Sequence, residues 1–155
     1  MKPKGDLREL LSCSCFAARR AARVITQHHD HYLKPTGLRA TQLAMLTVLS
    51  LAGPMPLTAL AEQLGTERTT VTRNLRLMLE RGYVAEGPSD DRRVRMLAAT
   101  PRGTAAAHAA LPHWRKAQSS LAASLGSAAI DGLHTAAHGA TRLAGRRARV
   151  SPGRE

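Results

Sequence analysis

Residues 60–75 read LAEQLGTERTTVTRNL, and this stretch decides the fold. Two helices that cross at a steep angle need a small residue at the crossing, a turn residue that tolerates positive φ, and an apolar anchor on the second helix. Ala61, Gly65 and Val71 supply these features at offsets of four and then six residues. The spacing therefore predicts a helix-turn-helix.

The second helix of this unit has two chemically different faces. Val71, Leu75 and Met78 put an apolar face inward. Short hydroxyls and arginines on the opposite face suit base edges and phosphates in a DNA major groove. A plain solvated hairpin is the alternative, but threonine is a mediocre helix former and such a surface more often carries Glu/Lys pairs. The residues expected to contact DNA here are Thr66, Arg68, Thr69, Thr70, Thr72, Arg73 and Arg76.

A charged hairpin is expected after the helix-turn-helix. Between residues 83 and 100 the helical period is lost, and two short strands flank PSDDRR at residues 88–93. Arginines at such a tip can enter a minor groove, and a neighbouring carboxylate can aim a guanidinium. A tip that only protects a sheet edge from pairing is the alternative. The wing residues expected to act in DNA binding are Asp91, Arg92, Arg93 and Arg95.

Helices are expected on both sides of this lobe, so the predicted fold class is mainly α with a small β-hairpin wing (α+β). The chain of 155 residues suits one domain. The first expected element is a helix over 7–33 opened by an Asp6/Glu9 capping box, followed by a helix over 41–51 and helices over 59–64 and 67–81 capped by Thr58 and Thr66. After the hairpin we expect a helix from Pro101 that Pro112 can kink, then a break at Gly126 and Ser127, and a last helix to about residue 149. The tails at 1–5 and 150–155 are expected to be flexible.

The composition favours a polyanionic partner. The net charge is +12, and neutralising phosphates releases condensed counterions. A nonspecific DNA-packaging protein, a ribosomal protein or a protein on an acidic membrane surface would have a similar charge. No apolar run is long enough for a membrane span, no signal peptide is recognisable, and two cysteines are too few for a disulfide scaffold. We therefore expect a cytoplasmic protein with no membrane partner.

Several ordered motifs resemble the MarR family of bacterial regulators. They are LAEQLG at 60–65, TVTR at 70–73, LERGYV at 79–84, DRRV at 91–94 and LAATPRG at 97–103. The resemblance implies a homodimer held by helices over 7–33 and 101–149, around a winged helix-turn-helix lobe over 40–100. It also implies that Arg93 is the wing arginine, oriented by Asp91. The alanines at 98 and 99 depart from the family, where threonine often follows the leucine directly.

Cys13 and Cys15 raise the possibility of thiol chemistry. Residues two apart on one helix point about 200° apart, which argues against an intrachain metal clamp. By this reasoning Cys13 faces apolar neighbours and is inert, whereas Cys15 lies near Arg19, and a guanidinium favours the thiolate. The MarR family includes a hydroperoxide-sensing branch with a reactive cysteine near the start of this helix. Cys15 resembles that cysteine in its location. Simple packing at a dimer interface is the alternative for both residues.

Histidines gather near the end of the first predicted helix. His28 and Tyr32 share a face at four-residue spacing and are expected to line a cleft between the dimer helices and the DNA-binding lobe. His28, His29 and His31 lack cysteine or carboxylate neighbours at a convincing ligand spacing, since Asp30 points elsewhere, so no metal site is predicted. No phosphate-binding loop, serine elbow or carboxylate pair is recognisable. We therefore expect neither an enzyme nor a bound cofactor.

The residues thus predict a regulator that binds double-stranded DNA. The family resemblance implies that it is a dimer, most simply a repressor, that binds a pseudo-palindromic operator and associates with the nucleoid when bound. The family resemblance implies release by a small organic anion or phenolic ligand. Thiol sensing through Cys15, with Arg19 nearby, is one alternative. Nonspecific DNA packaging, or a winged helix used for protein contact, is the other.

Overall fold

The computed structural model describes residues 6–88 and 94–148, with side chains described as far as residue 142. The expected tails at 1–5 and 150–155, and the hairpin tip with Asp91, Arg92 and Arg93, lie outside the described residues. In chain order the elements are η1 (Leu7–Ser12), α1 (Ser14–Leu33), η2 (Lys34–Thr36), α2 (Ala40–Ala52), β1 (Met55–Pro56), α3 (Leu57–Gln63), α4 (Arg68–Glu80), β2 (Val84–Gly87), β3 (Met96–Ala99), α5 (Pro101–Leu125) and α6 (Ser127–Ala148).

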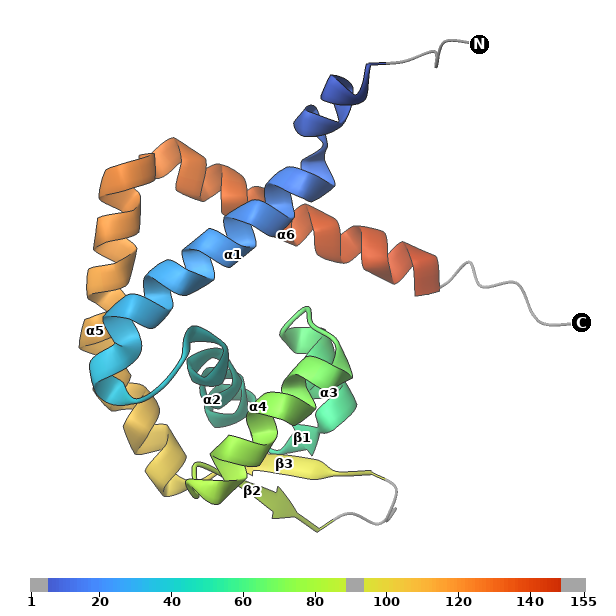
Figure 1. The fold of residues 1–155 in the computed structure, drawn as a ribbon. Coiled ribbons are helices and arrows are strands. Elements are labelled where there is room, and N and C mark those ends of the chain that lie inside the picture. Colours follow the sequence, from blue (N-terminus) through green and yellow to red (C-terminus); the bar gives the residue numbers. More distant parts are fainter. Residues whose placement is uncertain (1–5, 89–93, 149–155) are drawn as a thin grey trace, which may run out of the picture.

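The central lobe consists of α2, α3 and α4 beside a three-stranded antiparallel sheet (Figure 1). The strand order is β1-β3-β2, and Leu97 of β3 pairs with Met55 on one side and Glu86 on the other. The core is aliphatic, and its largest fully buried side chains are Leu33, Met45, Leu46, Leu60, Val71, Leu75, Met78 and Leu97. This is a winged helix, so the predicted fold class is confirmed.

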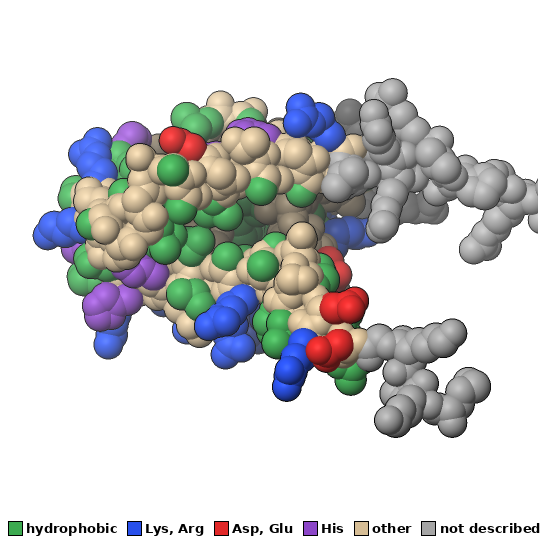
Figure 2. Space-filling view, turned by 90° about the horizontal axis from the view of Figure 1, so that it is seen from above, with side chains coloured by type: hydrophobic (Ala, Val, Ile, Leu, Met, Phe, Trp, Pro, Cys, Tyr) green, Lys and Arg blue, Asp and Glu red, His purple; other side chains and the backbone are tan. Residues whose placement is uncertain are grey.

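The long helices α1, α5 and α6 lie outside this lobe (Figure 1). α1 packs along α5 and also contacts α2, while α5 contacts α2 and β3. α1 therefore has two neighbouring helices within this chain. α6 packs against α5, and among its residues up to 142 none is fully buried. Figure 2 shows apolar side chains on both sides of a hollow in this part of the surface.

The first helix is shorter than predicted, because Cys13 interrupts it. Residues Leu7–Ser12 form a 3₁₀ helix, and Cys13 is extended (φ −62°, ψ 122°) before α1 begins. Asp6 does cap the start, accepting from the Arg8 N–H at 3.0 Å. At the other end the Ser12 hydroxyl donates to the Glu9 carbonyl at 2.7 Å. Such a local side-chain bond competes with continued helical pairing.

Two further predictions about the lobe were wrong in detail. Pro56 and Glu67, rather than Thr58 and Thr66, occupy the N-cap positions of α3 and α4, and neither makes a side-chain cap. Strand β1 was not predicted at all. It has two residues and forms only because β3 lies beside it, so no alternating pattern marks it in the sequence.

Gly103 sets how closely α5 approaches the sheet. A Cβ there would lie 2.0 Å from the Tyr83 carbonyl oxygen, so only glycine fits without a shift of the backbone. Thr100 completes the junction. Its hydroxyl donates to the Gly82 carbonyl at 2.7 Å and accepts from the Gly103 N–H at 3.0 Å. Pro101 then opens α5 as predicted, and the helix continues through Pro112.

Candidate nucleic-acid interface and ligand pocket

The helix α4 presents its polar side to solvent. Val71, Leu75 and Met78 are at most 1% exposed. The opposite face is open and holds Arg68, Thr69, Thr70, Thr72, Arg73 and Arg76, all exposed, with Thr66 half-buried at its start. Gly65 allows the turn before α4 with a φ of +60°. The predicted orientation of this helix is confirmed, whereas contact of each residue with DNA stays a prediction.

Hydrogen bonds to backbone carbonyls of α4 engage the side chains of Thr72 and Asn74, whereas the arginine side chains of this helix stay exposed to solvent. The Thr72 hydroxyl donates to the Arg68 carbonyl at 2.8 Å. The Asn74 amide donates to the Thr70 carbonyl at 3.0 Å and accepts from Thr41 at 3.4 Å. Arg76 keeps an 85% exposed side chain even though it lies 3.5 Å from Glu80. An exposed pair of this kind is weak and can be exchanged for a phosphate.

Helix and wing meet around a hollow of about 520 Å³. Its lining is Thr72, Arg73, Leu75, Arg76, Leu79 and Arg95, so three arginine side chains contribute to one concave surface. Arg95 comes from the segment just before β3 and pairs with Glu86 of β2. Its position beside α4 was not visible in the sequence, where Arg95 was assigned only to the wing. A surface of this shape and sign is suited to a nucleic-acid backbone.

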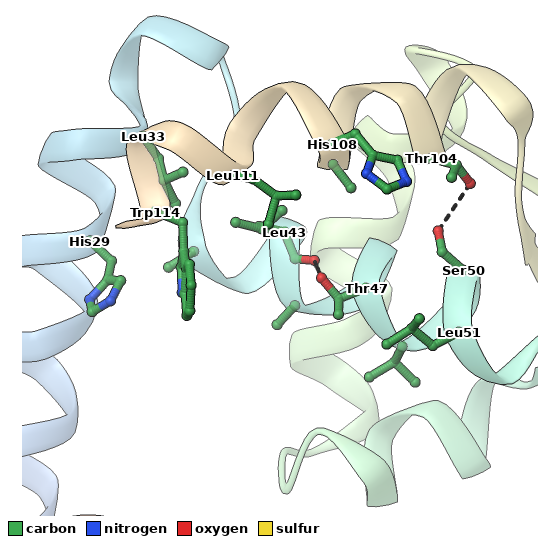
Figure 3. A pocket seen from close by; sticks show the side chains of 14 residues that line it. His29, Leu33, Leu43, Thr47, Ser50, Leu51, Thr104, His108, Leu111 and Trp114 are labelled. Atoms are coloured by element: carbon green, nitrogen blue, oxygen red, sulfur yellow. Dashed lines mark hydrogen bonds between the residues drawn. The ribbon is translucent and has the colours of Figure 1, made fainter. Parts of the chain in front are cut away.

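A second, larger hollow of about 640 Å³ lies between α1, α2 and α5 (Figure 3). Its wall is mostly apolar, with Trp114 and Leu111 from α5 opposite Leu43 from α2. Its polar groups are His29, Thr47, Ser50, Thr104 and His108. Hollows of this size and lining are typical of small-molecule sites.

The predicted effector residues do not line this hollow. His28 instead donates from Nε2 to the Ala117 carbonyl at 3.1 Å, and its ring lies 5.1 Å from that of Tyr32, so both help to pack α1 on α5. The neighbouring His29 lines the hollow in their place. Cys15 and Arg19 are exposed on α1 and are also absent from the lining. Sequence reasoning missed His108 and Trp114, because their neighbours in the hollow come from α2, far away in the chain.

The thiol environment differs from the one predicted. Both cysteines are exposed, so Cys13 is not buried among apolar neighbours within this chain. Cys13 is the N-cap of α1, where no side-chain cap hydrogen bond is formed, and the backbone N–H groups of Phe16 and then Cys15, at the start of the helix, lower the pKa of its thiol. The prediction that Cys13 faces apolar neighbours was therefore wrong within this chain, whereas its reactivity stays a prediction. It assumed one continuous helix, whereas the chain is extended at this residue.

Two further observations concern metals and membranes. Within residues 6–88 and 94–148, no three His, Cys, Asp or Glu side chains come together in a way that could hold a metal ion. None of the helices in the same ranges has the length and apolar character needed to cross a membrane.

Comparison with known proteins identifies the family. The MarR family model matches residues 38–94. A crystal structure of the M. tuberculosis transcriptional regulator MosR in complex with DNA is 38% identical, with a TM-score of 0.68, and the match covers 83% of this chain and 98% of that one. The chain belongs to the MarR family. The MarR-family winged helix thus places it among DNA-binding transcription regulators.

Two other similarities agree with this assignment. The uncharacterized HTH-type transcriptional regulator YwoH of Bacillus subtilis is 31% identical over 80 residues, which span 52% of this chain and only 58% of that relative. A crystal structure of a mutant E. coli MarR complexed with operator DNA has a TM-score of 0.73 over 88% of this chain and 99% of that one. Its identity of 18% supports the shared fold alone.

Proposed function

We propose that this MarR-family chain is a homodimeric repressor that binds a pseudo-palindromic operator and leaves it when a small molecule fills the hollow between α1, α2 and α5. The observation that carries the DNA-binding part is the polar face of α4 meeting Arg95 around one concave, arginine-lined surface. Arg73 and Arg76 enter the major groove, and the wing, including Arg93, follows the adjacent minor groove.

Dimerisation is supported by apolar side chains that this chain alone leaves open. Leu10, Leu11 and Phe16 at the N-terminal end, and Leu133 on α6, are large and exposed. Such a set is unusual for a protein that stays monomeric. Residues 7–33 and 101–149 therefore form the dimer contact in this proposal, and the lobe over 40–100 binds DNA. The two α4 helices should then lie about 34 Å apart, one turn of DNA.

Ligand control follows from the position of the hollow. Its lining joins α2 of the DNA-binding lobe to α1 and α5 of the dimer helices. A ligand that binds one spacing of the lobes more tightly than the other shifts the population toward that spacing. If the favoured spacing does not match successive major grooves, the operator is released.

The DNA-binding part is tested with single arginine variants and a charge-matched control. Genomic fragments that bind the purified protein are first selected and footprinted, and one protected fragment is used for titrations at several salt concentrations. Arg73→Ala and Arg76→Ala should each weaken binding, with a salt slope reduced by about 1 where a phosphate contact is lost. Lys34→Ala removes one positive charge from the exposed connection after α1, outside the proposed dimer and DNA contacts, and should change binding little.

Two results would contradict the proposal. Equal losses in all three variants would mean that only total charge matters, as in a packaging protein. Uniform protection of the DNA with no preferred fragment would also indicate a packaging protein. If the two arginine variants lose affinity while Lys34→Ala does not, and a footprint is seen, the α4 face reads an operator.

A thiol sensor is the second candidate, favoured by the exposure of both cysteines and the lowered pKa of Cys13. Thiolates react with hydroperoxides, so oxidation at Cys13 or Cys15 could alter the α1 N-terminus at the dimer contact. Operator binding is measured after mild hydroperoxide treatment of wild type, Cys13→Ser and Cys15→Ser. Loss of binding in wild type that is spared in a serine variant supports sensing. Unchanged operator binding by all three proteins after the treatment rules out thiol sensing.

A further inference from the structure

Arg95 is held from two sides at the base of the wing. Its backbone carbonyl accepts from the Leu57 N–H at 3.1 Å, so the first residue of α3 fixes the main chain there. Its side chain donates from Nη2 to Oε1 of Glu86 on β2. The Arg95 side chain is 46% exposed, against 85% for that of Arg76 on α4. Arg95 therefore has less freedom than an ordinary surface arginine.

The register of the sheet makes this ion pair possible. Glu86 lies opposite Leu97, and residues directly opposite each other in an antiparallel pair point to the same face. Leu97 is fully buried in the core, so this face is the one that packs against the helices of the lobe. By the two-residue period of a strand, Arg95 shares this face and is the diagonal neighbour of Glu86. The ion pair thus keeps Arg95 on the side of the sheet where α4 lies beside β2 (Figure 1).

A second carboxylate near these arginines, Glu80, restrains its partner much less. Glu80 and Arg76 are four residues apart on α4, and Arg76 Nε lies 3.5 Å from Glu80 Oε1. Both side chains are more than half exposed, and an exposed pair on one helix is weak. Glu80 and Glu86 therefore each pair with an arginine that lines the hollow between α4 and the wing, but only Glu86 fixes its arginine.

This hollow lies where a backbone strand of bound DNA must pass. In the proposed function α4 enters a major groove and the wing follows the adjacent minor groove. One sugar-phosphate strand separates these two grooves, so it crosses the concave surface lined by Arg73, Arg76 and Arg95. Arginine has five N–H donors, and the bond to Glu86 uses one of them. The Arg95 guanidinium can therefore still bind a phosphate.

We propose that Glu86 is a positioning residue for DNA binding, which holds Arg95 on the α4 side of the wing so that it binds a phosphate of the strand between the two grooves. This inference rests on the proposed function and adds an acidic residue to its DNA-binding surface. A long side chain that is already ordered loses less conformational entropy on binding. Repulsion between the carboxylate and the phosphates opposes this gain, so a variant of Glu86 must be compared with a variant of equal charge.

Two carboxylate variants form the matched test. Glu86→Gln and Glu80→Gln each remove one negative charge near the same surface, so charge alone predicts that both tighten DNA binding equally, by up to about threefold. Glu86→Gln should instead bind about two- to tenfold more weakly than Glu80→Gln, the usual cost of ordering one long side chain. Binding is titrated on the protected fragment and on an unrelated duplex, at several salt concentrations.

A double-mutant cycle shows whether Glu86 acts through Arg95. Arg95→Ala should weaken binding to both duplexes and reduce the salt slope by about 1, as expected when a phosphate contact is lost. In the Arg95→Ala background, Glu86→Gln should bind as tightly as Glu80→Gln, because no guanidinium is left to position. A penalty that persists in this background means that Glu86 only stabilises the wing, and this result overturns the inference.

The mobility of the arginine side chains gives a readout that needs no DNA. NMR relaxation of the Nε–H groups in the free protein should show that Arg95 is more ordered than Arg76. In Glu86→Gln, Arg95 should become as mobile as Arg76. Equal mobility of the two arginines in the wild type overturns the inference.

The outcomes are separable from those of the proposed function. If Glu86→Gln binds as tightly as Glu80→Gln, the inference is overturned while operator binding stands. If the wild type binds the two duplexes equally, operator binding is contradicted. The difference between the two glutamine variants, measured on either duplex, then still supports or overturns the role of Glu86.

Discussion

Replacing Gly103 with alanine should destabilise the protein, because the backbone of α5 touches the backbone of the segment before β2 at this point. The added Cβ would lie 2.0 Å from Tyr83 O and 2.8 Å from its carbonyl carbon. Ordinary contact begins near 3.4 Å. Neither atom belongs to a side chain that could rotate away, so α5 and the sheet must separate by more than about 1 Å, against the stiffness of a close-packed interior.

The size of the effect follows from three contributions. Overpacking of a close-packed site costs about 1–3 kcal/mol. Tyr83 O accepts from the Thr100 N–H at 3.0 Å and from its hydroxyl at 3.2 Å, and losing one of these bonds costs about 1 kcal/mol more. Alanine regains about 1 kcal/mol over glycine within a helix. We expect a net loss of about 1–3 kcal/mol, which lowers the Tm of a chain this long by about 2–12 °C.

Thermal and urea unfolding at one fixed protein concentration measure this change, because the stability of the proposed dimer would depend on protein concentration. The matched control is Gly132→Ala in α6, where a Cβ meets nothing within 4 Å. That variant should be about 0.5–1 kcal/mol more stable than wild type through helix propensity alone. If both variants gain stability, α5 does not approach Tyr83 as closely as described, and the reasoning fails.

Three further changes test other contacts. Arg81→Gln removes the hydrogen bond of 2.7 Å from Nη1 to the Gly37 carbonyl, so the free energy of urea unfolding should fall by about 1 kcal/mol. An unchanged urea midpoint would mean that this bond is not formed in solution. Asp30→Ala removes the carboxylate that accepts from the Ala40 N–H at 2.7 Å at the start of α2, and should also cost about 1 kcal/mol, with Asp30→Asn retaining part of it. The lowered pKa of Cys13 keeps its thiolate present at lower pH than in an unfolded chain, so in a Cys15→Ser variant alkylation should begin at lower pH when folded than in urea. Matching pH profiles in the two states would mean that the backbone N–H groups at the start of α1 do not lower the pKa of the Cys13 thiol.

The helix-turn-helix was predictable because its determinants are local. Ala61, Gly65 and Val71 lie within eleven residues, and each acts through its size or backbone freedom, so the sequence specifies the turn without knowledge of distant parts. The inward face of α4 followed from simple helical spacing in the same way. The end of α5 at Gly126 was found by the same kind of local signal.

What the sequence did not reveal depends on contacts between distant segments. The ligand hollow needs His29, Ser50 and Trp114, which come together only when α1, α2 and α5 pack. None of them stands in a recognisable motif. The break at Cys13 was missed for a different reason, because a run of helix-compatible residues hides one hydroxyl-to-carbonyl bond that diverts the chain. The hydrogen bond that Asp30 makes at the start of α2 was missed for a related reason. It forms only because η2 turns the chain back, so that α2 begins beside the end of α1.

The hydrogen bond from Arg81 to Gly37 anchors the carboxyl end of α4 to the connection between α1 and α2. The amino end is held as well, because Val71 is buried in the core of the lobe and the Thr66 N–H donates to the Ala61 carbonyl at 3.0 Å. α4 therefore has no free end, although its polar face stays open to solvent. A change at the connection between α1 and α2 reaches this arginine-bearing helix through a direct side-chain contact, with no intervening element.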